Sequence, residues 1–431
     1  MKIAIAGTGY VGLVTGVCLA EVGHENVVCL DVDKQKVDLM KDGVSPIYEE
    51  HLEELMKKNY EKGRIDYTTN YKDAYKDADI IMIAVGTPER SDGSANLDYI
   101  KKVAKQIASS VTKDTLVVIK STVPIGTNDA IEKFIRENLK NKVKIELASN
   151  PEFLSQGTAV MDTLNASRIV IGVESEWAKN ILEKVYKPFN QPIVVTNRNS
   201  AEMIKYASND FLALKISFMN DIANLCEIVG ANIEDVAKGM SYDERIGSKF
   251  LKAGIGYGGS CFPKDTKALH WLASHNGYEL KTVKAAIEVN ESQKLRLVRK
   301  AANLVESFDG MKVAVLGLTF KPETDDLREA PSIPNIQYLL ERGAEVVAYD
   351  PVGIENAKKI FKDSITYTTS IDEAIKDADI CFIMTEWKQI LNYDISNYKS
   401  KMKRPLVFDG RNCYTLDTMK DSGIEYYSIG R

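Results

Sequence analysis

The sequence has few of the residues that build metal sites and disulfide frameworks. It contains four histidines and six cysteines in 431 residues, and no two cysteines form a C-x-x-C pair. His270 and His275 are the only histidines close together, and they lack the i,i+4 spacing of a helical metal site. We therefore expect no bound metal, no disulfide scaffold and a reducing, cytoplasmic environment. The cysteines are Cys18, Cys29, Cys226, Cys261, Cys381 and Cys413.

The sequence also lacks long apolar runs and a strong excess of one charge. No stretch reaches the roughly 18 apolar residues of a membrane-spanning helix. The formal net charge of −5 comes from 56 basic and 61 acidic residues without a basic block, which argues against nucleic acid or an anionic membrane as a partner. The apolar run after Met1 is similar to a signal peptide, but four glycines interrupt it. With 44% hydrophobic residues the chain can form buried cores, and its length predicts about three domains.

Glycines form the first functional motif. Residues 2–6 predict a buried strand, and GTGYVG at 7–12 follows directly before an expected helix. A second predicted strand, 27–31, ends in an aspartate. This order is typical of a dinucleotide-binding β–α–β unit, although a glycine-rich packing turn is the alternative. The aspartate would accept ribose hydroxyls and repel the extra phosphate of NADP. We therefore expect NAD to contact Gly7, Gly9, Tyr10, Val11, Gly12 and Asp31.

Polar residues follow the next predicted strands. Residues 79–85, 115–119 and 143–148 form apolar runs suited to buried parallel strands. Thr87 and Thr122 follow the first two runs within three residues, at the strand ends where open parallel sheets bind ligands. Both threonines are therefore candidates for facing the nicotinamide ring, with helix capping as the alternative.

The far end of the chain repeats the organisation of its beginning. KVAVLG at 312–317 matches KIAIAG at 2–7, and KDADICFIM at 376–384 matches KDADIIMIA at 76–84. We predict an α/β protein with two Rossmann-like, doubly wound domains joined by a helical segment, divided as 1–198, 199–300 and 301–431. The second copy lacks the glycine fingerprint, which predicts that it has lost dinucleotide binding. The broad apolar band of the helical segment favours burial between domains or between subunits, and we expect a homodimer or a higher homo-oligomer through this segment.

The stretch GIGYGGSCFPKD at 254–265 forms the second functional motif. We expect a flexible glycine loop followed by a helix that begins at Pro263. Cys261 would then lie at a helix N-terminus, where the dipole and unpaired amides stabilise a thiolate. This favours a nucleophile, with a buried bystander as the alternative, and Asp265 could serve the same site as a proton acceptor. The other five cysteines are interpreted as packing residues.

Lys205 and Asn209 have i,i+4 spacing, so one helix face would present both. Together they could stabilise an oxyanion, although a solvated lysine beside an asparagine is the plainer interpretation. A nicotinamide cofactor combined with a cysteine nucleophile predicts oxidation of an alcohol to a carboxylate, because a thiohemiacetal turns the aldehyde into a second hydride donor. Such a reaction uses two NAD per turnover.

The chain resembles the UDP-glucose/GDP-mannose dehydrogenase family over essentially its whole length. The resemblance implies two-step, NAD-dependent oxidation of the C6 alcohol of UDP-glucose to UDP-glucuronate through a cysteine thiohemiacetal and thioester. GDP-mannose or a UDP-hexosamine as substrate, or non-catalytic nucleotide-sugar binding, are the alternatives. The form GGSCFPKD is similar to the UDP-glucose branch. The motifs that support the resemblance are GTGYVG (7–12), GTP (86–88), KSTVPIGT (120–127), NPEFL (150–154), AEMIKYASN (201–209), ERIGSKFLKAGIGYGGSCFPKD (244–265), GLTFKPETDDLRE (317–329) and FDGR (408–411).

The resemblance also implies roles for single residues. For catalysis it implies Cys261 as the nucleophile and Lys205 with Asn209 as the ligands of the oxyanions. It also implies Asp265 with Thr122 for removal of the proton, and Glu152 for activation of the water. On the cofactor side it adds the cations Lys264 and Arg328. For the nucleotide sugar it implies Glu152, Phe153, Leu154, Lys205, Asn209, Arg245, Lys252, Tyr257, Gly258, Lys321 and Arg411. Arg245 would reach the site of a neighbouring subunit.

The chain departs from the family pattern at Gln156, where the family usually has a glutamate. An amide cannot accept a proton. Either Glu152 serves alone in thioester hydrolysis, or the position only orients its loop. We favour the second interpretation.

Overall fold

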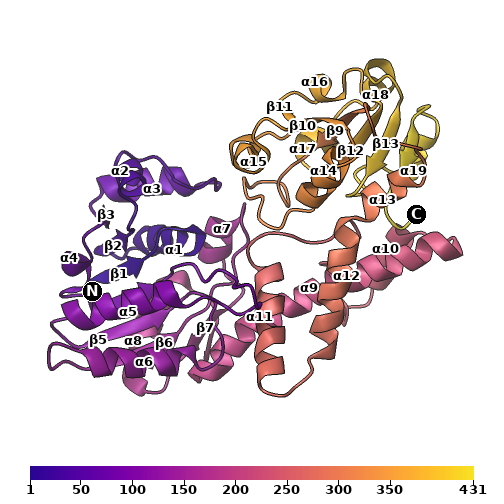
Figure 1. Cartoon of the computed structure of the whole chain (residues 1–431). Coiled ribbons are helices and arrows are strands. Elements are labelled where there is room, and N and C mark those ends of the chain that lie inside the picture. Colours follow the sequence, from indigo (N-terminus) through magenta and orange to yellow (C-terminus); the bar gives the residue numbers. More distant parts are fainter. The chain divides into compact units, whose positions relative to one another are not determined.

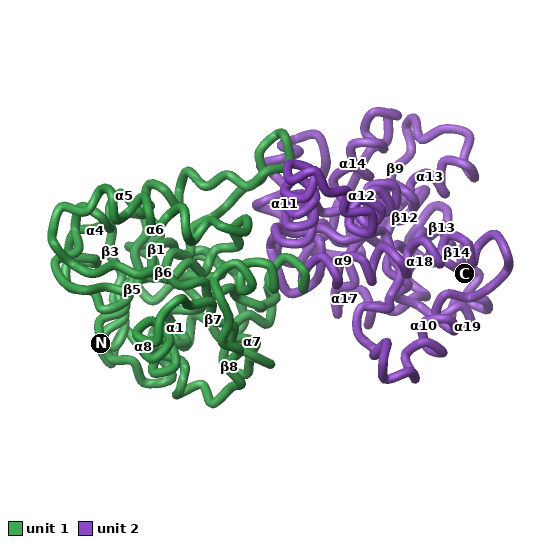
Figure 2. The backbone as a smooth tube through the Cα atoms, turned by 90° about the horizontal axis from the view of Figure 1, so that it is seen from below, with its two compact units in different colours: residues 1–208 green, residues 209–431 purple.

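The computed structural model describes residues 1–431 and divides them into two compact units. Unit 1 spans Met1–Ser208 and unit 2 spans Asn209–Arg431 (Figure 2). Each unit has its own sheet. The sequence-based division into three domains with boundaries at 198/199 and 300/301 stays a prediction.

Unit 1 contains an eight-stranded sheet in the order β3-β2-β1-β4-β5-β6-β7-β8. Its strands pair in parallel, except that β7 meets β6 antiparallel. The strands are β1 (Ile3–Ala6), β2 (Val27–Leu30), β3 (Ile65–Thr68), β4 (Ile80–Ile83), β5 (Thr115–Ile119), β6 (Ile145–Ser149), β7 (Ile169–Gly172) and β8 (Ile193–Thr196). The helices are α1 (Tyr10–Glu21), α2 (Lys34–Lys41), α3 (Leu52–Glu61), α4 (Tyr71–Tyr75), α5 (Asp98–Ser110), α6 (Thr127–Asn138), α7 (Ala159–Leu164), α8 (Glu176–Tyr186) and the short 3₁₀ helix η1 (Lys187–Phe189).

The first strand shows why this sheet is covered on both faces. Ile3 and Ile5 belong to one hydrophobic cluster, whereas Ala4 and Ala6 belong to another. Successive side chains of a strand point to opposite faces, so both faces must be buried. Figure 1 shows α1 on one side of these strands and α5 with α6 on the other, and these helices contribute to the respective clusters. The continuous apolar runs of the sequence are explained by this two-sided burial.

Unit 2 contains a six-stranded parallel sheet in the order β11-β10-β9-β12-β13-β14. Its strands are β9 (Lys312–Leu316), β10 (Glu345–Tyr349), β11 (Thr366–Thr368), β12 (Ile380–Ile383), β13 (Leu406–Asp409) and β14 (Glu425–Tyr427). Its covering helices are α14 (Ser332–Leu340), α15 (Ile354–Phe361), α16 (Ile371–Ile375), α17 (Lys388–Leu391), α18 (Ser396–Lys401) and α19 (Leu416–Lys420). Strand for strand, this is the order of the first six strands of unit 1, and the prediction of two Rossmann-like domains is confirmed.

The repeat extends to a matching hydrogen bond in each copy. The amide of Lys2 donates to Asp79 Oδ2 at 2.7 Å, and the amide of Lys312 donates to Asp379 Oδ2 at 3.0 Å. Each aspartate lies just before the central strand, β4 or β12, which starts one residue later. The repeated KDADI therefore ties that strand to its neighbour in both sheets.

The predicted helical segment contains α9 (Arg198–Val229), α10 (Ile233–Ser241), α11 (Phe262–His275), α12 (Lys281–Lys294) and α13 (Arg296–Ala302). One face of α9 packs on α12, where Ser217 Oγ donates to the carbonyl of Ala286 at 2.7 Å and Asn224 Nδ2 donates to Gln293 Oε1 at 2.9 Å. None of the helices combines the length and apolar character needed to cross a membrane.

Candidate functional site

The glycine turn after β1 is shaped by two close approaches and one open position. Gly7 has φ +98°, and a Cβ at Gly12 would lie 1.9 Å from the carbonyl oxygen of Gly7. A side chain at Gly12 would therefore separate α1 from the strand. A Cβ at Gly9 would meet no heavy atom within 4 Å. Since Gly9 also precedes the first residue of α1, the open space lies beside the helix start, where a pyrophosphate binds in such folds.

Asp31 follows β2 and is hydrogen-bonded to this turn. Its Oδ2 accepts from Thr8 N at 3.0 Å and from Thr8 Oγ1 at 2.5 Å, and its Oδ1 accepts from Asp33 N at 3.0 Å. Burial opposes ionisation, but the bonds from Thr8 and Asp33 hold the pKa of Asp31 below its usual value. The carboxylate thus stays charged at the strand end, as an acidic partner for ribose hydroxyls requires. The open turn and this charge fit an NAD molecule.

The second copy of the unit uses its aspartate differently. Asp350, after β10, is fully buried and accepts hydrogen bonds from six protein donors, namely the amides of Leu318, Thr319, Val352 and Gly353, the Thr319 hydroxyl and the indole Nε1 of Trp387. Its lone pairs are therefore occupied within the fold. This gives a physical reason for the predicted loss of dinucleotide binding in the second copy.

The strand-end threonines of unit 1 lie together. Thr87 Oγ1 donates to the carbonyl of Thr122 at 2.9 Å, which joins the loops after β4 and β5. Sequence reasoning missed the buried Lys120 between them and the next strand end. Its Nζ donates to Asn150 Oδ1 at 2.9 Å, and burial lowers the pKa of Lys120 to about 8. Most lysine side chains are exposed to solvent, so the sequence offered little reason to expect a buried one. The only signal was the position of KST directly after an apolar strand.

Glu152 and Lys205 form a nearly buried ion pair in unit 1. Lys205 Nζ lies 2.9 Å from Glu152 Oε1, and the side chains are 3% and 9% exposed, respectively. Glu152 Oε2 accepts from the amide of Leu154 at 2.7 Å, which fixes the turn. Lys205 and Arg168 both lie over the ring of Phe153, at 5.5 Å and 3.8 Å from its centroid. The solvated-lysine interpretation of Lys205 is therefore wrong, because this ammonium is held by a carboxylate and an aromatic face.

Cys261 has the position that the sequence suggests. It is the N-cap residue of α11, its side chain is exposed, and Ser260 Oγ lies 3.8 Å from its Sγ. The helix begins at Phe262 rather than at Pro263, so the proline occupies the second helical position, where its missing N–H is still not needed. Of the other cysteines, four are buried and Cys413 is half-buried. Burial raises the pKa of Cys18 to about 12, as it does that of Cys29.

Asp265 lies one turn after Cys261 and is held from two sides. Asn209 Nδ2 donates to Asp265 Oδ2 at 2.7 Å, and Lys264 Nζ lies 2.5 Å from Asp265 Oδ1. Asp265 is 1% exposed, so the ammonium and the amide replace water as its partners. The two residues predicted as a pair on α9 thus bind different carboxylates: Lys205 binds Glu152, and Asn209 binds Asp265.

The glycine loop before Cys261 is hydrogen-bonded to side chains of α9 and α12. Asn220 Oδ1 accepts from the amide of Gly254 at 2.8 Å, and Gln293 Nε2 donates to its carbonyl at 2.7 Å. Asn290 likewise binds both the amide and the carbonyl of Tyr257. A Cβ at Gly258 would lie 2.4 Å from the carbonyl oxygen of Glu329. The glycines therefore allow close packing here, and closure of the loop on a ligand stays a prediction.

Arg411 ties the loops of unit 2 together. Its guanidinium donates to the carbonyls of Met384, Gly256 and Phe320 at 2.9, 3.1 and 3.2 Å. Lys321 Nζ lies 5.8 Å from the centroid of the Phe320 ring. Through its bond to Gly256, Arg411 reaches the glycine loop.

The other predicted cations lie at the surface. Arg328 pairs with Asp326 and Arg245 pairs with Asp243, each at 2.6 Å, and Lys252 is exposed. The structure groups no three or more His, Cys, Asp or Glu side chains into a possible metal site.

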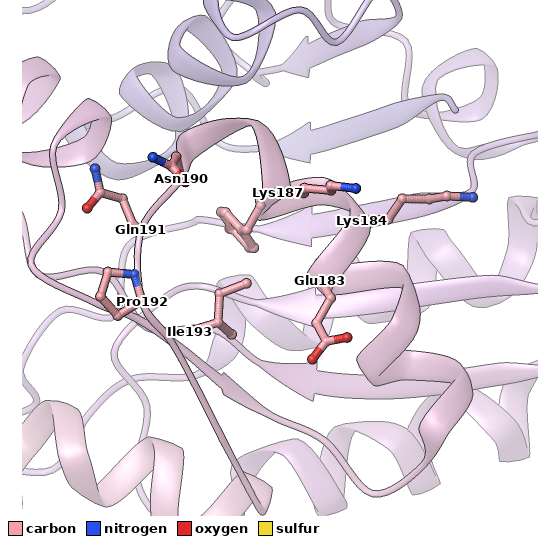
Figure 3. Close-up of a pocket in the computed structure, with 8 residues that line it drawn as sticks. Glu183, Lys184, Lys187, Asn190, Gln191, Pro192 and Ile193 are labelled. Atoms are coloured by element: carbon pink, nitrogen blue, oxygen red, sulfur yellow. The ribbon is translucent and has the colours of Figure 1, made fainter.

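A shallow pocket of about 600 Å³ lies elsewhere on unit 1 (Figure 3). It lies between α8, η1 and β8, and none of the predicted site residues lines it. Glu183, Lys184 and Lys187 are among its lining residues.

Three models of the UDP-glucose/GDP-mannose dehydrogenase family match consecutive parts of the chain. The NAD binding domain matches residues 1–190, the central domain residues 199–292, and the UDP binding domain residues 314–416. The UDP-glucose 6-dehydrogenase YwqF of Bacillus subtilis (strain 168) is 53% identical over all of this chain and 98% of its own length. The chain belongs to the UDP-glucose/GDP-mannose dehydrogenase family.

Solved structures of similar proteins agree with this family membership. A UDP-glucose dehydrogenase from the hyperthermophilic archaeon Pyrobaculum islandicum is 37% identical, with a TM-score of 0.92 over 99% of this chain and 96% of that one. A UDP-D-ManNAc dehydrogenase from Pyrococcus horikoshii is 27% identical, with a TM-score of 0.88 over 100% and 99%. Members of the family that act on different sugars therefore share this fold.

Within the family framework, the predicted residues fall into two groups by unit. In unit 1, the structure brings Thr87 to Thr122 and Glu152 to Lys205. In unit 2, it brings Asn209 to Asp265 beside Cys261. Lys205 and Asn209 lie one turn apart on the single helix α9. The sequence predicted these residues singly, but it did not reveal that Lys205 pairs with Glu152 or that Asn209 binds Asp265.

Proposed function

We propose that this chain oxidises the C6 alcohol of UDP-glucose to UDP-glucuronate in two NAD-dependent steps. The observation that supports this most directly is the exposed Cys261 thiol at the N-terminus of α11, one turn before a buried carboxylate. Its relatives of 53% and 37% identity are UDP-glucose dehydrogenases. An oxidation that stopped at the aldehyde would not need this thiol.

NAD, when bound, supplies a hydride acceptor for each of the two oxidations. The residues that would hold it are those of the glycine turn, Gly7, Gly9, Tyr10, Val11 and Gly12, with Asp31 at the strand end and Thr87 and Thr122 at the next two strand ends. We include Lys264 and Arg328 as cations on the cofactor side. A glycine turn with open space at Gly9 and a charged Asp31 supports this placement.

The chain's own residues account for the proton and acyl chemistry. In the first oxidation the alcohol loses a hydride and a proton, and we assign removal of the proton to Asp265, with Thr122 as its partner. The Cys261 thiolate then adds to the aldehyde carbon. The resulting thiohemiacetal loses a second hydride and becomes a thioester.

Water attacks the thioester, the carbon–sulfur bond breaks, and acid and thiol are released. We assign activation of this water to Glu152, whose second oxygen holds the amide of Leu154. Lys205 and Asn209 would stabilise the oxyanions formed along the way, because each brings a donor to the reaction from a buried, ordered position. Gln156 would orient its loop.

We assign the nucleotide sugar to the remaining predicted residues, which are Phe153, Leu154, Arg245, Lys252, Tyr257, Gly258, Lys321 and Arg411. A UDP-sugar has two phosphate charges, and cations with fixed geometry favour its binding. Arg411 is supported best, because three backbone carbonyls fix its guanidinium. We also propose that the protein works in the cytoplasm, where a catalytic thiol stays reduced.

The yield of NADH per sugar tests this function. Supplying limiting UDP-glucose with excess NAD is expected to give two NADH and one UDP-glucuronate per sugar. A plateau at one NADH with free aldehyde would show a simple alcohol dehydrogenase. A panel with GDP-mannose and UDP-hexosamines tests the sugar, and preference for one of them would contradict the assignment to UDP-glucose.

A further inference from the structure

Asp210 is a buried carboxyl that the proposed reaction does not use. It follows Asn209 on α9, it is 4% exposed, and neither carboxyl oxygen has a hydrogen-bond partner. An ionised carboxylate in such a place lacks both water and a donor. The neutral acid is therefore the form that this position favours.

The neighbours of Asp210 belong to the catalytic region of unit 2. Ser217 and Asn224 follow Asp210 at seven-residue intervals on α9 and bind α12, so Asp210 lies on the packed face of the helix. The adjacent Asn209 donates to Asp265 at 2.7 Å. The titratable and charged groups that interact with Asp210 are Asp265, Lys264 and Tyr257.

Asp210 and Asp265 are both buried and interact electrostatically, and two such carboxyls cannot both ionise without a large cost. Asp265 has the ammonium of Lys264 and the amide of Asn209 as partners, whereas Asp210 has none. The negative charge therefore belongs on Asp265 and the proton on Asp210. In agreement, burial first and the charge of Asp265 second raise the pKa of Asp210 to about 8, against a smaller opposing effect of Lys264.

We propose that Asp210 is a positioning residue that acts through Asp265. As a neutral acid it leaves Asp265 as the single negative charge of the pair, held by Asn209 and Lys264. When it loses its proton to solvent, a second negative charge forms beside Asp265 and disturbs that arrangement. This inference rests on the proposed function, in which Asp265 assists proton removal, and it predicts that alkaline pH impairs the reaction through Asp210.

The test compares pH profiles of kcat for the wild-type protein and Asp210→Asn, whose amide has the shape of the neutral acid. The ratio of the variant's kcat to that of the wild type is expected to rise by roughly threefold or more between about pH 7 and pH 9, because only the wild type gains the extra charge. Asp221→Asn is the matched control. It removes an exposed carboxylate from the same helix and should follow the wild-type profile.

Thermal stability supplies a readout that does not depend on turnover. The folded-state pKa of Asp210 lies above the unfolded value of 3.8. The protonated side chain's contribution is therefore complete below about pH 4 and is lost as the pH rises through about 8. The Tm of Asp210→Asn minus the Tm of the wild type should therefore increase between about pH 4 and pH 8 and stay constant above that. In an Asp265→Asn background, the pH at which this Tm difference levels off should be lower, because the neighbouring charge is gone. We call this pH the Asp210 transition.

The outcomes separate this inference from the proposed function. A changing kcat ratio together with a transition that moves in Asp265→Asn supports the proposal. Parallel kcat profiles overturn it, even if Asp210 titrates. The proposal is also overturned if the pH of the Asp210 transition is unchanged in Asp265→Asn. If no nucleotide sugar yields NADH, the proposed function fails, whereas the two stability measurements still decide whether Asp210 and Asp265 interact.

Discussion

At the residue scale, position distinguishes Cys261 from the other five cysteines. Cys18, Cys29 and Cys381 lie in buried strands or helices, where burial raises the pKa of each thiol. Cys261 is instead exposed at the first turn of a helix. A helix start favours the thiolate and an apolar core disfavours it, so one cysteine is suited to covalent chemistry.

Replacing this nucleophile should separate binding from turnover. Cys261→Ser is expected to lower NADH formation by orders of magnitude, because a serine hydroxyl in the same place is a far weaker nucleophile toward the aldehyde. Binding of UDP-glucose, measured by calorimetry, should persist. Cys413→Ser, which changes a half-buried thiol in the same unit, serves as the control. Wild-type turnover in Cys261→Ser would refute the nucleophile assignment.

Lys120 gives unit 1 a pH-dependent stability of its own. Burial lowers the pKa of Lys120 from 10.5 to about 8. Below that pH the folded protein holds an ammonium in a dry site. As the pH rises from about 8 toward 10.5, the folded state releases this proton before the unfolded state does, and stability recovers by on the order of 3 kcal/mol.

Lys120→Met should remove this gain. The difference in unfolding free energy between wild type and variant, measured by urea denaturation at each pH, is expected to change across that window. Lys113→Met, at an exposed lysine of the preceding turn, is the control. A constant difference from about pH 7 to pH 10.5 would contradict the assigned shift.

At the element scale, the glycine turn separates packing from ligand binding. Gly12 has a backbone oxygen where a Cβ would lie, whereas Gly9 faces open space and has φ −77°, which any residue can adopt. Glycine therefore occupies these two positions of one motif for different physical reasons. The fold requires the glycine at position 12, and we propose that cofactor binding requires the one at position 9.

The substitutions Gly12→Ala and Gly9→Ala should therefore have opposite signatures. Gly12→Ala is expected to destabilise the protein by about 1–3 kcal/mol or more, because helix and strand must move apart. Gly9→Ala should keep the wild-type Tm and weaken NAD binding about tenfold or more, since its methyl group takes the space of the pyrophosphate. Titration calorimetry and thermal melts distinguish the two. Equal NAD affinity in Gly9→Ala would place the cofactor elsewhere.

The sequence predicted elements well where local patterns decide them, and less well where distant residues do. The strand repeat, the helix after Cys261 and the two strand-end threonines follow from apolar runs and turn residues. The anchored state of the 254–260 loop depends on Asn220, Asn290 and Gln293, which are distant in sequence and look like ordinary helix residues. The burial of Asp210 and Lys120 could not be predicted for the same reason, because it depends on tertiary packing and not on local sequence.

At the scale of the whole molecule, α9 has an apolar stripe that supports the predicted homodimer. Phe211, Phe218 and Leu225 recur every seven residues and are 61%, 51% and 51% exposed, and Ile228 beyond them is 79% exposed. Large apolar side chains grouped on one helix face are typical of an association surface. A second copy of this chain, with the same stripe, can cover it by two-fold symmetry.

Charges on this stripe should therefore prevent association. Phe218→Asp combined with Leu225→Asp is expected to shift the protein to monomers in analytical ultracentrifugation and to lower turnover, since Arg245 is proposed to serve a neighbouring subunit. Tyr99→Asp, at a 55% exposed position of α5, controls for the loss of a surface apolar group. An unchanged sedimentation coefficient would show that the stripe is not the interface.

The six donors around Asp350 have a consequence for the order of the reaction steps. With the second copy predicted to have lost dinucleotide binding, we expect a single cofactor site in each chain, yet the proposed reaction uses two cofactors. The spent cofactor must leave and a fresh one arrive while the half-oxidised sugar waits. The residence time of that intermediate has to exceed the exchange time of the cofactor. In the proposed reaction, the covalent bond to Cys261 would hold the sugar in place during this exchange.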